Sequence, residues 1–180
     1  MSTPKLVPLD RGEGSPLVPT GNPLVDAVGP ATYTERQDVP DITAHGEAKI
    51  VPMRFAPTFF IAPQDPDPRG LKVEACDGAV AGVVKDLWVD KAEPQIRYYE
   101  VELANGSGVV LVPVALIQWP MFGLVKTDKV LVKAITAAQF ADVPRTKSPM
   151  QVTLLEEDKI MAYFSGGHLY ATPARAQPLV

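Results

Sequence analysis

Short runs of β-branched and aromatic residues, separated by turn signals, occupy the middle of the chain. Asp-Gly at 77–78, Pro94 and Asn-Gly at 105–106 separate most of these runs and are typical of tight turns. Such spacing predicts a small antiparallel sheet that curls toward a barrel. The predicted strands cover residues 72–76, 82–89, 96–103, 109–114 and 130–135.

The C-terminal part changes to a helical pattern. Thr153 and Glu156 stand three residues apart, as in a capping box, in which each side chain accepts a backbone N–H at the helix start. A helix should follow, with Glu156, Glu157 and Asp158 near the positive end of its dipole. Gly166 and Gly167 predict a left-handed stop at its end.

The N-terminal part is distinguished by proline. Twelve of the 19 prolines fall in the first 68 residues, which predicts extended chain. The apolar pairs at 17–18 and 24–25 favour a docked strap over a loose tail, and residues 31–37 predict a short helical turn. The expected fold is therefore mainly β, with an extended proline-rich arm (residues 1–69) followed by a barrel domain with a C-terminal α-helix and tail (residues 70–180).

Composition excludes several classes of function. The net charge of −4 and the absence of a Lys/Arg cluster argue against nucleic-acid binding. Cys76, the one cysteine, fits a reducing compartment and a small buried side chain rather than a nucleophile. The uncharged run at 104–125 is interrupted by turn residues and prolines, so it does not predict a membrane-spanning helix.

Acids recur on one face of the strand predicted at 82–89 and just beyond it. Alternate residues of a strand share a face, which groups Asp86, Trp88 and Asp90. The spacing leaves two readings open: acids at strand edges that serve solubility and turn formation, or carboxylates that carry chemistry.

The polar loop 38–49 offers the other candidate chemistry. It holds His45, one of two histidines, with Asp41 and Glu47, groups that can handle protons near neutral pH. A solvated loop is the alternative. The sequence contains no phosphate-binding glycine loop, no closely spaced His or Cys pair and no nucleophile elbow. We therefore expect no enzyme, and a hydrolase that uses Asp86 and Asp90 is the least favoured reading.

At the level of motifs, residues 77–90 resemble the PRC-barrel pattern, found in photosynthetic reaction centres and ribosome-maturation factors. From about Ser15 to the C-terminus, the chain is similar to the H subunit of purple-bacterial reaction centres. The segments that carry this resemblance are 19–23, 29–31, 67–71, 152–159 and 166–173.

The resemblance implies a non-catalytic subunit that caps the L and M subunits on the cytoplasmic face of the photosynthetic inner membrane. It implies shielding of the acceptor quinones, support of assembly and proton relay to the secondary quinone. Bacteriochlorophyll, bacteriopheophytin, quinones and iron would belong to the partner subunits, with none bound by this chain. Light-harvesting antenna subunits are further possible partners. The alternative is a free cytoplasmic PRC-barrel adaptor that binds a protein or ribosomal partner.

The family's N-terminal membrane helix has no counterpart in the sequence. Two explanations are open: the chain is a shortened form, or the gene is split and a separate polypeptide supplies the helix. In either case the present chain is expected to be peripheral to the membrane. The apolar segment at 119–124 resembles an insertion relative to many family members. It is expected to contact the membrane surface or another subunit, or else to fold onto the barrel.

The resemblance also assigns proton-transfer residues. Glu93 matches the acid closest to the quinone, with Asp90 nearby and Asp86 on the same strand face. His45 and Asp41 match the surface entry region. Glu47 stands where family members often have a second histidine, and Thr43 where they have an acid, which disfavours a metal-inhibitable histidine pair. Glu47 can still exchange protons.

Overall fold

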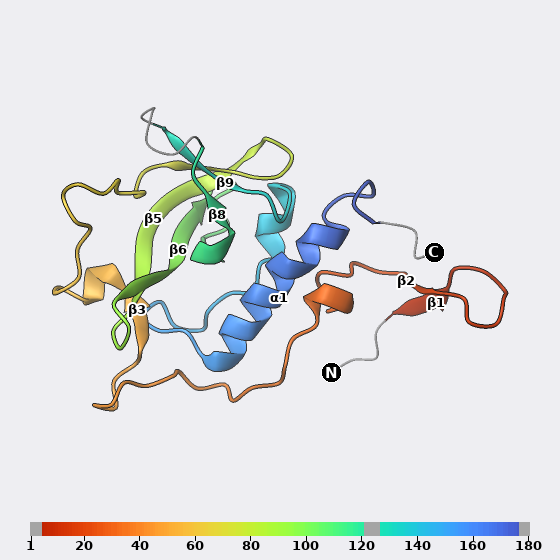
Figure 1. The fold of residues 1–180 in the computed structure, drawn as a ribbon, viewed down its shortest axis with the longest axis horizontal. Coiled ribbons are helices and arrows are strands. Elements are labelled where there is room, and N and C mark those ends of the chain that lie inside the picture. The colour runs from red at the N-terminus through yellow and green to blue at the C-terminus, as the bar shows by residue number, and fades with distance from the viewer. Residues whose placement is uncertain (1–4, 121–126, 177–180) are drawn as a thin grey trace.

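The computed structural model describes residues 5–120 and 127–176. Two long strands lie at the centre of the fold (Figure 1). β5 (Val80–Asp90) pairs along its length with β6 (Gln95–Leu103). The same sheet also contains β3 (Ile50–Pro52), β4 (Lys72–Glu74), β7 (Val109–Pro113), β8 (Ile117–Gln118) and β9 (Lys129–Val132). The strand order is β7-β6-β5-β4-β9-β8, and β3 also pairs with β5. The mainly β fold is confirmed, although β4 and β9 pair in parallel.

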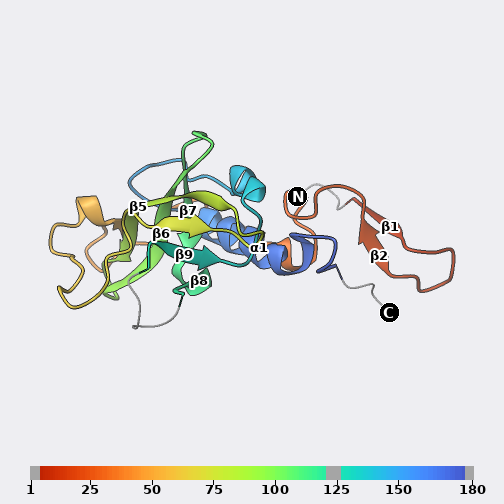
Figure 2. The ribbon, with the colours of Figure 1, turned by 90° about the horizontal axis from the view of Figure 1, so that it is seen from above.

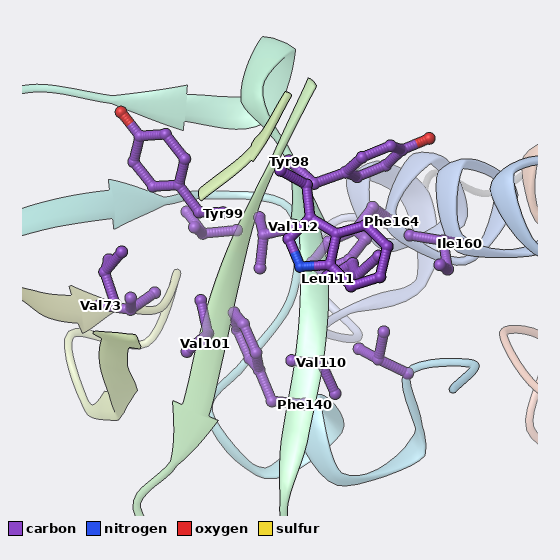
Figure 3. Close-up of a cluster of buried hydrophobic side chains, with 14 of the residues drawn as sticks. Val73, Tyr98, Tyr99, Val101, Val110, Leu111, Val112, Phe140, Ile160 and Phe164 are labelled. Carbon is purple, nitrogen blue, oxygen red and sulfur yellow. The ribbon is translucent and has the colours of Figure 1, made fainter. Parts of the chain in front are cut away.

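The sheet closes over apolar side chains and is covered by α1 (Leu154–Tyr170), the one α-helix within residues 5–120 and 127–176. Figure 3 shows Val101 and Val110 of the sheet facing Phe140, while Ile160 and Phe164 project from α1 into the same cluster. The Phe140 and Phe164 rings meet edge to face at 5.8 Å. Burial of this cluster joins helix and sheet into one core.

α1 begins as its sequence predicts and ends later. The Thr153 side chain accepts the Glu156 N–H, and the Glu156 carboxylate accepts the Thr153 N–H, which confirms the capping box. The predicted glycine stop is wrong, because the helix continues through Gly166 and Gly167 to Tyr170. Both glycines are there for close packing: a Cβ on Gly166 would lie 2.6 Å from Ala31 Cβ, and one on Gly167 would overlap the Ala134 carbonyl.

The arm contains more regular structure than its prolines predict. β1 (Leu6–Pro8) and β2 (Leu17–Pro19) form a hairpin that projects from the body (Figure 2). Residues 24–31 then dock against α1, with Leu24, Val28 and Ala31 buried, as expected of a strap. The helical turn expected at 31–37 is wrong: a 3-10 turn spans Gly29–Ala31, and residues 32–37 are irregular. Cys76 is half-buried.

Candidate functional site

A buried carboxylate stands where β5 ends. Asp90 is 0% exposed, and its Oδ1 accepts the backbone N–H groups of Ala92 (2.9 Å) and Glu93 (3.0 Å). Its Oδ2 has no hydrogen-bond partner among the described residues. The nearest cations are Lys49 Nζ at 3.7 Å and Arg97 NH1 at 3.9 Å. These two positive charges offset the cost of burying the carboxylate, while their distances leave Oδ2 open to a further donor.

Lys49 connects this carboxylate to the surface. Its Nζ lies 3.5 Å from Asp41 Oδ2, so one ammonium group stands between a half-exposed and a buried acid. The pKa of Lys49 is raised, chiefly by the charge of Asp90 and further by Asp41. Backbone pairing sets this position, because Ile50 is paired with Asp90 and the Lys91 N–H donates to the Lys49 carbonyl.

The loop 38–49 folds back on itself and presents the other predicted residues at the surface. The Thr43 N–H donates to the Glu47 carbonyl, and the Lys49 N–H donates to the Asp41 carbonyl. Glu47 is exposed and pairs with Lys91, whose hydrogen bond lowers the pKa of the Glu47 carboxyl. His45 is exposed at the tip of the same loop. Asp41, His45 and Glu47 therefore share one loop next to Asp90.

Glu93 extends the cluster on its other side. It is exposed, follows Asp90 in the β5–β6 turn and accepts a hydrogen bond from Gln95 Nε2 at 3.2 Å. Its charge contributes to the raised pKa of Lys49, after the larger effect of Asp90, which places it in electrostatic reach of that ammonium group. The structure thus brings Asp90 and Asp41 together around Lys49, with Glu93 in electrostatic reach, whereas Asp38 of the same loop pairs with Lys147.

Asp86 lies apart from this cluster, four residues earlier on β5. It is buried, and Arg54 NH1 bridges it to Glu100, at 2.8 Å to Asp86 Oδ2 and 2.9 Å to Glu100 Oε2. Trp88 Nε1 also donates to Glu100 at 2.8 Å. Burial of Asp86 and Asp90 shows that solubility at a strand edge was the wrong interpretation of these acids. Asp86 thus belongs to an ion network in which Arg54, in the 3-10 turn Met53–Phe55 after β3, joins buried acids of β5 and β6.

Sequence reasoning missed several charged groups at the site. Lys49 and Arg97 were not singled out, and Glu157 was assigned only to the helix dipole. In the structure, Tyr98 Oη donates to Glu157 Oε2 at 2.7 Å. Burial raises the pKa of the Glu157 carboxyl, the Tyr98 hydrogen bond opposes this shift, and the charge of Asp41 adds to it. No local pattern could have revealed Glu157, because its partners come from β6 and the 38–49 loop.

We expect Glu157 to titrate above its ordinary value of 4.5. Because folding raises this pKa, ionisation of Glu157 opposes folding, and the cost grows as pH rises from about 4.5 through the folded-state pKa. Glu157→Gln should therefore gain stability relative to the wild type over that range. Carboxyl-carbon NMR gives the midpoint directly, and Tyr98→Phe should raise it further by removing the hydrogen bond. A Glu157 midpoint at or below 4.5 would contradict the burial effect.

Two further observations concern metal ions and membrane spans. Within ranges 5–120 and 127–176, no three His, Cys, Asp or Glu side chains gather closely enough to hold a metal ion. No helix in the same ranges is both long and apolar enough to cross a bilayer. Of the apolar segment at 119–124, Trp119 and Pro120 are half-buried, and the remainder lies outside the described residues.

Comparison with protein families gives two matches along the chain. Residues 3–55 match the model of the photosynthetic reaction centre H-chain N-terminal region, and residues 64–139 match that of the PRC-barrel domain. The chain is therefore an H-subunit-like protein. The acid cluster of this H-like chain draws on both parts: Asp41 and Lys49 come from the H-chain region, whereas Asp90, Glu93 and Arg97 come from the barrel. The H-chain match favours a reaction-centre role over the free adaptor, for which a PRC barrel alone would suffice.

Proposed function

We propose that this H-like chain is a non-catalytic subunit that caps the cytoplasmic face of a reaction centre, shields its acceptor quinones and relays protons to the secondary quinone. The observation that supports the relay is the buried Asp90 carboxylate, whose Oδ2 accepts no hydrogen bond from any residue that the structure describes. It lies between Lys49, which leads to the surface loop, and Glu93, which follows it in the chain.

The proposed relay has a physical purpose. A doubly reduced quinone needs two protons, and a buried dianion without them is very costly. Protons would enter at His45, Glu47 or Asp41, pass Asp90 and leave at Glu93. Lys49 Nζ, at 3.5 Å and 3.7 Å from its two acids, would keep its proton and hold the Asp41 and Asp90 carboxylates near one another, and water beside these groups would carry the proton between them. We leave Asp86 out of the proposed route, because Arg54 and two backbone N–H groups already donate to its oxygens.

Flash-induced proton uptake and second electron transfer in the assembled complex test the relay. We expect Asp90→Asn and Glu93→Gln each to slow both processes by about tenfold, since each removes a group that can carry a proton. Glu102→Gln is the matched control, because Glu102 is an exposed acid on β6 that pairs with Lys85 and lies outside the cluster. Unchanged kinetics of both variants from mildly acidic to alkaline pH would remove these residues from the route.

The proposed partners are the L and M subunits, with antenna subunits and a separate membrane-helix polypeptide as further candidates. Bacteriochlorophyll, bacteriopheophytin, quinones and iron would reside in those partners, and this chain would be peripheral on the cytoplasmic side. Affinity isolation of the tagged full chain from pigmented membranes tests the assignment. Recovery of pigment with L and M supports it, and recovery of this chain only in the pigment-free soluble fraction would favour the adaptor.

A further inference from the structure

An open apolar groove adjoins the acid cluster. Its volume is about 660 Å³, within the range of binding sites for small molecules and peptide side chains. Its lining includes Phe59 and Phe60 of the segment after β3, Ile96 and Tyr99 of β6, and Trp119. The groove is therefore formed by residues 58–68 together with the beginning of β6, which follows Glu93 in the chain.

Large apolar side chains are exposed at the groove. Phe60 is 76% exposed, more than any other large hydrophobic side chain in the described part of the molecule. Phe59, Ile61 and Trp119 are half-buried against the core, so they are held in place while one side of each remains open. Fixed aromatic side chains around an open groove are typical of the central contacts of protein interfaces.

The rim of the groove is acidic. Asp65 lines the groove and has no ion-pair partner among the described residues. Glu93 precedes the groove residues Pro94 and Gln95, and its one side-chain hydrogen bond in the described structure comes from Gln95. Asp67 is excluded from this rim charge, because Arg69 neutralises it. An occupant with an apolar centre and cationic ends would match this distribution of charge.

We propose that the groove binds the water-exposed end of a partner's membrane helix, an apolar helical segment flanked by Lys or Arg. Membrane helices carry such residues preferentially at their cytoplasmic ends. An anionic lipid surface fits less well, because Asp65 and Glu93 would repel it. A second copy of this chain also fits less well, since a two-fold contact would bring the same acidic rims together. The inference rests on the proposed function, because a reaction-centre complex would supply such a helix. Binding of that helix would attach this chain to the complex.

Binding of two synthetic helical peptides to the full chain tests the proposal. Both have the same Leu/Ala centre, one with Lys at its ends and one with Glu. Trp119 fluorescence reports binding, because the other tryptophan, Trp88, is 1% exposed. We expect the Lys-flanked peptide to bind the full chain. Phe60→Ser should lower the affinity for this peptide at least about tenfold, and the double variant Asp65→Asn with Glu93→Gln should lower it about fivefold at low salt. Phe55→Ser, at a 51% exposed aromatic outside the groove, is the matched control.

Several results would overturn the proposal. The proposal is wrong if the Lys-flanked peptide does not bind or if both peptides bind equally well. It is also wrong if Phe60→Ser and Phe55→Ser lower the affinity for the Lys-flanked peptide by the same factor. Phe60-dependent binding to phosphatidylglycerol vesicles in place of the peptide would assign the groove to lipid, and Phe60-dependent self-association in sedimentation would assign it to a second copy. Peptide binding by a chain that does not co-isolate with pigment would keep the groove assignment and reject the reaction-centre role, so the two failures are distinguishable.

Discussion

Replacing Arg54 with methionine is expected to lower the free energy of unfolding by about 3 kcal/mol, because it leaves two buried carboxylates without their shared cation. Asp86 and Glu100 are 5% and 3% exposed, and Arg54 NH1 contacts both. This loss is at the lower end of the range that is usual for removing one partner of a buried ion pair, because the Arg54 side chain is itself 37% exposed. Asp86 also keeps the backbone N–H groups of Arg54 and Leu87, and Glu100 keeps Trp88 Nε1.

Urea unfolding followed by fluorescence gives this free energy. Lys85→Met is the matched control: Lys85 and Glu102 also pair across β5 and β6, but their side chains are 50% and 60% exposed. Its expected cost is below about 1 kcal/mol. Adding Asp86→Asn and Glu100→Gln to Arg54→Met should recover much of the loss, because no buried charge then remains unpaired. Equal costs for Arg54→Met and Lys85→Met would show that burial of the network contributes nothing.

Gly167→Ala is expected to cost about 2 to 3 kcal/mol, although alanine favours helices in general. A Cβ at this position would overlap the Ala134 carbonyl oxygen and the Ile135 side chain, and the backbone atom cannot move aside as a flexible side chain could. Arg175 NH1 adds to the effect, because it donates to both the Ala134 carbonyl (2.8 Å) and the Gly167 carbonyl (2.9 Å). Moving α1 away from the segment after β9 would break this double contact.

Thermal unfolding checks this prediction, with a fall in Tm of about 4 to 12 °C expected for a chain of this size. Ser165→Ala is the control, because Ser165 lies in the same helical turn, is half-buried and makes no side-chain hydrogen bond within the described residues. It should change stability by no more than about 0.5 kcal/mol. Wild-type stability of Gly167→Ala would mean that α1 does not pack as closely on this segment as the structure shows.

Local sequence determined the elements whose signals are local. Strand positions followed from short Val-rich runs between turn residues, and the start of α1 followed from the Thr153–Glu156 capping box, because both depend on neighbours within a few residues. The end of α1 did not follow. Gly166 and Gly167 looked like a helix stop, and only the approach of Ala31 and Ala134 shows that these glycines serve packing.

The same division holds for the candidate site. The sequence by itself supplied the acids, the histidine loop and the family resemblance that selected Asp90 and Glu93. Tertiary structure alone decided that Asp90 is buried between Lys49 and Arg97, that Asp86 belongs to a separate ion network, and that Glu157 joins the cluster from α1. The physical reason is that burial and charge pairing depend on residues far apart in the chain, whose proximity is created only when the 38–49 loop, β5, β6 and α1 pack together.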